Sequence, residues 1–162
     1  MQSLTFSEIA LRLGAAVLCA LLIGLEREVK HKNAGIRTYI LVCLGCTGFT
    51  ILIQEIGAYF QAIRVDIQLD PSRIVQGVVT GLGFLGGGAI LQRNEGVTGV
   101  ATGAGIWVSG AIGIACGFGF YTLAILLTLA TTLVLGVLGV VRAKFRDDID
   151  EDKGDVSGNG CE

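Results

Sequence analysis

The fold is decided by the stretch GVTGVATGAGIWVSGAIGIACGFGFYTLAILLTLATTLVLGVLGVV, 46 residues from Gly96 to Val141 without a single Asp, Glu, Lys or Arg. About 20 apolar residues cross the hydrocarbon core of a bilayer as a helix, so this stretch is long enough for two crossings. A water-soluble protein of 162 residues is too small to bury such a run on all sides. The stretch therefore predicts an integral membrane protein.

The rest of the chain extends this prediction to five transmembrane helices. The uncharged stretch divides at residues 117–121, where glycines permit a tight bend and aromatic residues suit the interface. Thr5 to Glu8 has the pattern of a helix capping box, and Pro71 lies in a polar connection before the third apolar segment. The sequence predicts an all-α bundle with spans at about 5–25, 39–56, 73–91, 97–117 and 121–141, followed by a charged, disordered tail over 142–162.

Composition narrows the function classes. Charged residues make up 16% of the chain, whereas soluble domains carry about 25%. The chain has 25 glycines and one proline, and glycine inside apolar segments indicates helices whose backbones approach closely. No basic region is long enough to indicate nucleic-acid binding. No nucleophile, base and orienting group stand at a spacing that predicts an enzyme.

The distribution of basic residues predicts the orientation. With the N-terminus outside, nine basic residues fall on the inner side and three on the outer side, which is the bias of the positive-inside rule. We therefore expect a multi-pass protein of a bacterial inner membrane with its C-terminus in the cytoplasm. The inner residues are Arg27, Lys30, Lys32, Arg37, Arg93, Arg142, Lys144, Arg146 and Lys153, and the outer ones are Arg12, Arg64 and Arg73.

Polar side chains gather at the inner ends of the expected spans, and no charged residue lies near the middle of any span. Such groups either anchor helices at the interface or converge into a functional site. Carboxylates could bind Mg²⁺ here, although neighbouring arginines would oppose a dication, so no metal ligand is assigned. We expect one functional cluster on the cytoplasmic side, formed by Glu26, Arg27, Arg37, Thr38, Asn94 and Thr98, in which Arg37 bridges a carboxylate such as Glu26.

Glycines in the third and fourth spans form a second set of candidates. Their four-residue spacing is typical of close helix packing, and the triplet Gly86 to Gly88 is expected to weaken the third span. A span broken at that point would line an ion path. The residues expected to pack helices or line a path are Gly77, Gly81, Gly83, Gly86, Gly87, Gly88, Gly99 and Gly103.

Two smaller features have structural interpretations. On the outer side, Asp70 and Arg73 are expected to form a helix cap and a local ion pair. Cys43 and Cys46 have C-x-x-C spacing, which redox or metal sites use, but inside an apolar segment they are better read as small apolar residues one helical turn apart.

Four stretches in order resemble the MgtC/SapB family of bacterial inner-membrane proteins. They are LIGLERE (residues 22–28), AGIRT (34–38), GLGFLGGGAI (81–90) and GVTGVAT (96–102), leading to Trp107 and Gly113. The resemblance covers roughly residues 9–140. Two departures are Gly86-Gly87-Gly88, where many members have Gly-Ala-Gly, and Thr98-Gly99-Val100, where many have Thr-Thr-Ala. Longer members carry a soluble C-terminal domain with no counterpart here, so we expect none of its functions to transfer.

The resemblance implies five spans, a cytoplasmic C-terminus and a role in Mg²⁺ homeostasis or stress adaptation. It leaves two hypotheses. The first is an accessory or regulatory protein that binds membrane partners, such as the ATP synthase, through small-residue helix faces. The second is a transporter or channel for Mg²⁺ or another ion. Small-residue faces also favour homo-oligomers, the lipid bilayer is the constant partner, and no cofactor is expected beyond Mg²⁺ as ligand or cargo.

Overall fold

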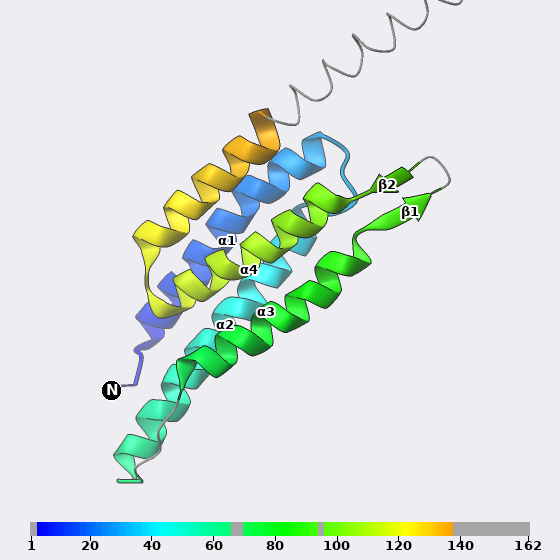
Figure 1. Cartoon of the computed structure of the whole chain (residues 1–162). Helices are drawn as coiled ribbons and strands as arrows, with labels where there is room; N and C mark the ends of the chain where they lie inside the picture. The colour runs from blue at the N-terminus through cyan, green and yellow to red at the C-terminus, as the bar shows by residue number, and fades with distance from the viewer. Residues whose placement is uncertain (1–2, 66–69, 94–95, 138–162) are drawn as a thin grey trace, which may run out of the picture.

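A computed structural model of the chain describes residues 3–65, 70–93 and 96–137, and these residues form a helical membrane bundle (Figure 1). The predicted all-helical fold class is confirmed. Between α3 and α4 the chain also forms a two-stranded hairpin that the sequence did not predict. The elements are α1 (Phe6–Val29), α2 (Ile36–Ala62), α3 (Pro71–Gly88), β1 (Leu91–Arg93), β2 (Gly96–Thr98), α4 (Val100–Phe118) and a last helix, Tyr121–Val137.

Three of these helices, α1, α2 and α4, are long and apolar enough to cross a membrane. The Tyr121–Val137 helix is apolar but shorter, as far as the described residues go. Helix α3 has 18 residues, and besides six glycines it contains the polar residues Ser72, Arg73 and Gln76, so it is less apolar than the other three. The orientation of the termini remains a prediction.

The start of α1 follows the sequence closely. The Thr5 side chain accepts a hydrogen bond from the Glu8 backbone, and the Glu8 side chain accepts one from the Thr5 backbone, so the predicted capping box is confirmed. At the same end of the bundle, Arg12 Nη1 donates to Gln54 Oε1 at 2.9 Å and to the Gly117 carbonyl at 2.6 Å. Arg12, which is expected near the outer membrane–water interface, therefore connects α1 to α2 and α4.

Helix α4 is the centre of the bundle and packs against α1, α2 and α3. Within its most apolar window 61% of residues are buried, against 28% in α1 and 33% in α2. Glycines make this packing close, because a Cβ added at Gly113 would collide with the Cys43 carbonyl and one at Gly117 would lie 2.5 Å from Thr50 Cβ. Small residues thus let α4 approach α2 almost to backbone contact.

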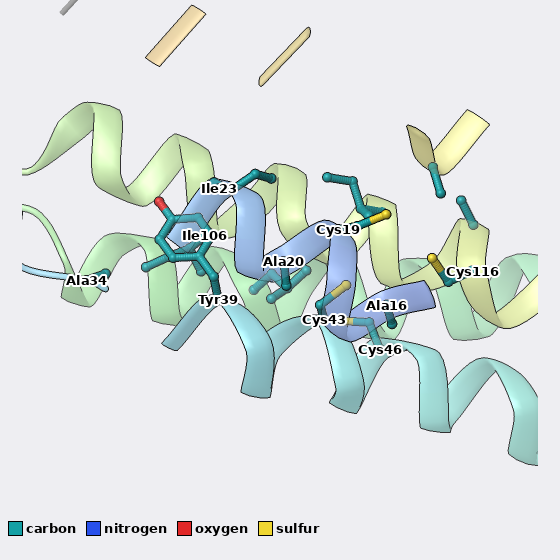
Figure 2. Packing of buried hydrophobic residues seen from close by; sticks show 14 residues of the cluster. Ala16, Cys19, Ala20, Ile23, Ala34, Tyr39, Cys43, Cys46, Ile106 and Cys116 are labelled. Atoms are coloured by element: carbon teal, nitrogen blue, oxygen red, sulfur yellow. The ribbon is translucent and has the colours of Figure 1, made fainter. Parts of the chain in front are cut away.

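The core around α4 contains four free cysteines and one buried tyrosine (Figure 2). Cys43 and Cys46 lie on α2 and are both buried, and Cys19 and Cys116 approach them from α1 and α4. Buried thiols of this kind pack as small apolar side chains.

The connection between α3 and α4 is a short β-hairpin. Strands β1 and β2 pair antiparallel, with Leu91 opposite Thr98 and Arg93 opposite Gly96. Gly96 and Gly99 have φ values of 128° and 89°, a region that favours glycine. Gly96 lies where the chain enters β2, and Gly99 lets the chain pass from β2 directly into α4.

Helix α3 corrects the expectation of a break at the glycine triplet. The helix continues through Gly86 and Gly87 and ends at Gly88, with Ala89 as its C-cap. A Cβ at Gly86 would lie 3.2 Å from the Gly103 carbonyl oxygen, so close packing on α4 supports the helix at this point. The triplet therefore lies at a helix–helix contact and at the end of α3.

The other end of α3 contains the expected cap. Asp70 Oδ1 accepts a hydrogen bond from the Ser72 backbone N–H at 2.9 Å. Hydrogen bonds from Ser72, with a smaller contribution from the charge of Arg73, lower the pKa of the Asp70 carboxyl. No ion pair between Asp70 and Arg73 is present in the described part of the chain, because Asp70 is turned toward the α3 amides.

Candidate functional site

One end of the bundle brings together four helix ends that are distant in sequence. The C-terminus of α1, the N-termini of α2 and α4 and the end of the Tyr121–Val137 helix meet there (Figure 1). A Cβ at Gly24 would lie 2.6 Å from Ile36 Cα, so α1 and the start of α2 are in near backbone contact. Most of the residues predicted as a functional cluster lie at this end.

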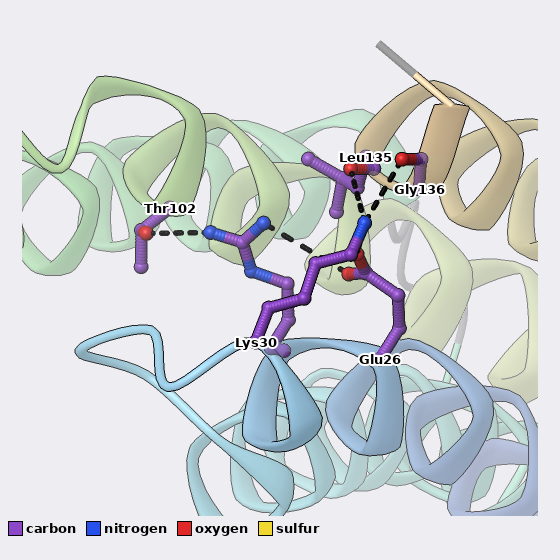
Figure 3. A network of polar contacts seen from close by, with 6 residues as sticks. Glu26, Lys30, Thr102, Leu135 and Gly136 are labelled. Carbon is purple, nitrogen blue, oxygen red and sulfur yellow. Dashed lines mark hydrogen bonds and ion pairs between the residues drawn. The ribbon is translucent and has the colours of Figure 1, made fainter. Parts of the chain in front are cut away.

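The centre of this end is an ion pair within α1 that also holds the last helix (Figure 3). Lys30 Nζ lies 2.7 Å from Glu26 Oε1, four residues earlier on the same helix face. The same ammonium donates to the carbonyls of Gly136 at 2.9 Å and Leu135 at 3.4 Å. A cation beside carbonyls on the C-terminal side of a helix complements the helix dipole. Lys30 therefore fastens the Tyr121–Val137 helix to α1.

Arg27 points in a different direction, toward the start of α4. Its side chain is only 4% exposed, and Nη2 donates to Thr102 Oγ1 at 2.9 Å. Glu26 Oε2 lies 3.9 Å from Arg27 Nη1, too far for a hydrogen bond. Arg27 Nε has no hydrogen-bond partner among the described residues. The guanidinium is therefore a buried cation that is only partly neutralised.

Tyr39 completes the cluster from the first turn of α2. The side chain is fully buried, and the hydroxyl lies close to the Arg27 guanidinium without forming a well-aligned hydrogen bond in the described part of the chain. A Cβ at Gly105 of α4 would collide with this hydroxyl, so the glycine makes room for it. Arg27, Tyr39 and the first two turns of α4 form one buried polar group.

The remaining predicted residues that the structure describes lie at the same end but outside this group. Arg37 is exposed and forms no ion pair within the described residues, so the expected bridge to Glu26 is wrong. Lys30 takes that place because it lies one helical turn from Glu26 on α1. Thr38 is half-buried on α2, Thr98 is exposed on β2, and Asn94 lies outside the described residues.

No group of three or more His, Cys, Asp or Glu side chains is placed to hold a metal ion within the ranges that the structure describes. Of the two carboxylates near the cluster, Glu26 pairs with Lys30, and Glu28 Oε2 accepts from the Ile36 N–H at 3.0 Å. Glu28 is thus held by the chain itself, whereas the Glu26 oxygens are buried beside Lys30 and Arg27 without a well-aligned hydrogen bond in the described part of the chain. The cluster therefore combines unsatisfied donors and acceptors.

The eight predicted glycines divide into two sets. Gly86, Gly99 and Gly103 lie at close backbone contacts, and a Cβ at Gly103 would approach the Gly86 carbonyl oxygen to 2.6 Å. The other five lie on α3, are exposed, and have no atom within 4 Å of an added Cβ: Gly77, Gly81, Gly83, Gly87 and Gly88.

Three residues of the site were not predicted, and only one had a signal. Lys30 stands four residues after Glu26, a spacing that favours an ion pair on a helix. Tyr39 and Thr102 are ordinary residues near the ends of apolar segments. Their roles depend on which helices are neighbours, and no local pattern contains that information.

Comparison with known proteins adds a family match. Residues 13–144 match the MgtC family. YhiD of Escherichia coli strain K12, named as a candidate magnesium transporter, is 42% identical over 132 residues, which is 81% of this chain and 60% of its own length. Protein SapB of Bacillus subtilis strain 168 is 38% identical over 115 residues, 70% of this chain and 49% of its own. Protein MgtC of Brucella abortus strain 2308 is 33% identical over 130 residues, which is 80% of this chain and 50% of its own length.

The chain therefore spans about half to three fifths of the length of these curated relatives. None of the three names refers to a catalytic reaction. No solved structure matches the chain.

Proposed function

This chain belongs to the MgtC family of membrane proteins, and from that premise we propose that it is an accessory or regulatory protein of the bacterial inner membrane, acting in Mg²⁺ homeostasis or stress adaptation. It acts by binding a transmembrane helix of another inner-membrane protein along α3. The ATP synthase is the candidate partner that the family resemblance suggests. The chain performs no catalysis in this proposal.

The observation that supports this proposal is the difference between the glycines of α3 and those of α4. On α4, Gly103, Gly110, Gly113 and Gly117 all lie where a Cβ would collide with or crowd a neighbour in the chain. On α3, five of six glycines face open space. The two helices are similarly rich in glycine, but α4 packs its glycines inside the bundle, whereas α3 does so only at Gly86.

A glycine inside a helix lowers the stability of that helix unless its missing side chain allows another group to approach closely. Each costs about 0.8–1 kcal/mol relative to alanine, because glycine loses more backbone freedom on folding. Five such positions on one short helix are explained if another backbone approaches there. Gln76 and Thr80 are exposed on the same helix, and Phe84 is 83% exposed. A partner helix would gain close packing along the glycines and a polar contact at Gln76.

Photocrosslinking from Phe84 tests this proposal directly. We expect p-benzoylphenylalanine at position 84 to form a covalent adduct with another inner-membrane protein in irradiated native membranes. Gly77→Leu with Gly81→Leu should weaken this adduct about tenfold, equivalent to about 1.4 kcal/mol, because the larger side chains prevent close approach. The adduct is identified by mass spectrometry.

Matched controls separate a specific face from general lipid exposure. Phe49 on α2 is 58% exposed and serves as the control crosslinking position, and Gly14 of α1, with no atom within 4 Å of an added Cβ, serves for Gly14→Leu. If the adduct contains only a second copy of the chain, α3 mediates self-association and does not bind another protein. An adduct insensitive to the α3 leucines would overturn the role of this face.

Ion transport is the second candidate function. The name of the Escherichia coli relative points to magnesium, and Gln76 and Thr80 place an amide and a hydroxyl on the exposed side of α3. In this alternative, α3 lines an ion path together with another helix. The Thr80 hydroxyl donates to the backbone carbonyl of Gln76 at 2.8 Å, which leaves the lone pairs of the hydroxyl and the side-chain amide oxygen of Gln76 to meet an ion.

Mg²⁺ flux into proteoliposomes, followed with a trapped dye, distinguishes the two functions. Under the regulatory proposal we expect flux equal to that of empty vesicles, from protein whose folding is checked by thermal unfolding. Saturable flux that Gln76→Leu abolishes would establish transport instead. Val75→Leu is the matched control because it changes a neighbouring apolar side chain only.

A further inference from the structure

We infer that Glu26 is a conformational switch inside the bundle. Its carboxylate exchanges between Lys30, which holds the end of the last helix, and Arg27, which is bonded to the start of α4 (Figure 3). The exchange connects the first turn of α4 to the end of the Tyr121–Val137 helix. This inference concerns regulation within the chain, goes beyond the proposed function and does not depend on a partner at α3.

The first observation is that one carboxylate lies between two cations. Glu26 Oε1 is 2.7 Å from Lys30 Nζ, whereas Glu26 Oε2 is 3.9 Å from Arg27 Nη1. A charge-assisted hydrogen bond from nitrogen to a carboxylate is about 2.7–2.9 Å long, so Glu26 pairs closely with Lys30 only. A shift of about 1 Å toward the guanidinium would reverse this preference. Within the described ranges, no other carboxylate pairs with either cation.

The second observation is that the present arrangement leaves polar atoms of this cluster unsatisfied. Both Glu26 oxygens, Arg27 Nε and the Tyr39 hydroxyl are buried and lack a well-aligned hydrogen bond among the residues that the structure describes. Buried polar groups without partners are unfavourable. Because donors and acceptors lie in the same cluster, movement of Glu26 toward Arg27 would let them satisfy each other without any added ligand.

The third observation is that the two cations differ in the partners open to them. The Lys30 side chain is 30% exposed, so its ammonium can turn to water or headgroups when the carboxylate leaves. The Arg27 side chain is 4% exposed and depends on groups inside the bundle. Its hydrogen-bond partner is the neutral Thr102 hydroxyl, at 2.9 Å. Arg27 therefore competes for Glu26 whenever its bond to Thr102 weakens, and Lys30 can release Glu26 at low cost.

The exchange changes a contact between helices. While Glu26 holds the ammonium of Lys30, this group stays beside the carbonyls of Leu135 and Gly136 and fastens the last helix to α1. When Glu26 turns to Arg27, the ammonium loses the carboxylate that positions it, and the end of the last helix is released. Glu26 thereby transmits a change at the start of α4 to the end of the Tyr121–Val137 helix.

Hydrogen exchange of the purified full chain in a neutral detergent tests this switch, because exchange rates report local opening. Thr102→Val removes the neutral acceptor of Arg27 and keeps the shape of the side chain, so Arg27 should take Glu26 from Lys30. We expect the backbone amides in the last turns of the Tyr121–Val137 helix to exchange about tenfold faster, because a hydrogen bond to a charged group is lost there.

A control and a double variant separate the switch from local damage to α4. Ser109→Ala removes another buried hydroxyl of α4, which donates to the Ile106 carbonyl at 2.7 Å, and it should leave these amides unchanged. In a Lys30→Met background the contact with the last helix is already absent, so Thr102→Val should cause no further acceleration. Additive effects of Thr102→Val and Lys30→Met, or unchanged exchange in Thr102→Val alone, would overturn the inference.

Arg27→Gln is expected to change the exchange rate in the opposite direction. Without the competing guanidinium the Glu26 carboxylate stays with Lys30, so the same amides should exchange several-fold more slowly than in the wild type. If Arg27 only supported the packing of this end, its removal would accelerate the exchange, and that result from a folded variant would also overturn the switch. If Arg27→Gln does not fold, the comparison of Thr102→Val with and without Lys30→Met decides.

Discussion

Replacing Gly113 with leucine is expected to prevent the native bundle from forming while leaving membrane insertion intact. A Cβ at this position would collide with the Cys43 carbonyl and lie 2.8 Å from Cys46 Cβ. The obstacle on one side is backbone, so α2 and α4 must separate along their length. We expect a loss of about 3 kcal/mol or more, which is a large share of the stability of a small protein.

The four cysteines that the structure shows as buried provide the measurement, in a Cys161→Ser background that removes the fifth thiol of the chain. A thiol-reactive fluorophore labels them only when the helices separate, so the labelling midpoint on heating reports unfolding in detergent. Gly48→Leu on α2 is the matched control, because its added Cβ would meet no atom within 4 Å and its labelling curve should follow the wild type. An unchanged midpoint in Gly113→Leu would contradict the close packing of α2 against α4.

Replacing Lys30 with methionine is expected to release the end of the last helix and lower the free energy of unfolding by about 2–3 kcal/mol. The substitution removes the partner of Glu26, whose side chain is 13% exposed, and two hydrogen bonds to the Leu135 and Gly136 carbonyls. Methionine keeps the length and the apolar stem, so the loss reflects the ammonium group.

Lys32 is the matched control for this change. It is exposed two residues later and makes no ion pair in the part of the chain that the structure describes, so Lys32→Met should be nearly neutral. Hydrogen exchange localises the effect, and we expect faster exchange in the last turns of the Tyr121–Val137 helix only. If Lys30→Met and Lys32→Met lowered the free energy of unfolding equally, the total positive charge at this end would determine the stability, and the specific contacts of Lys30 would not.

The all-helical fold class followed from hydropathy, because a helix of about 20 apolar residues is dictated by the bilayer and needs no tertiary information. The bounds of single helices did not follow as closely, since α2 covers Ile36–Ala62 where 39–56 is predicted. Hydropathy did not predict the β1–β2 hairpin or the unbroken course of α3, and each of these has a local cause. The β1–β2 hairpin has three residues in each strand, too few for an alternating pattern, and it depends on the positive φ of Gly96 and Gly99. The glycine triplet suggested a break in α3, but contact with α4 at Gly103 supports the helix there.

The polar site was predicted only in its location. Charge placed Glu26, Arg27 and Arg37 at one end of the bundle, and the family resemblance pointed to the same segments. Which side chains meet depends on how each helix is rotated about its own axis, and the sequence does not give that rotation. The sequence predicts Arg37 as the partner of Glu26, whereas the structure places Lys30 beside Glu26 and Tyr39 beside Arg27. For the glycines, spacing alone did not separate those buried against α4 from those left open on α3, because both sets have the same residue type and period.

The contact between Gly86 and Gly103 has a consequence for communication across the molecule. Helix α3 meets the rest of the chain mainly through α4, and Gly103 directly follows Thr102, which accepts the hydrogen bond from Arg27. A helix that binds α3 and shifts it at Gly86 would move the residue that holds the guanidinium. Thermodynamic linkage then requires reciprocity: by whatever factor the contact between Arg27 and Thr102 changes the affinity of α3 for its partner, binding of the partner changes the equilibrium of that contact.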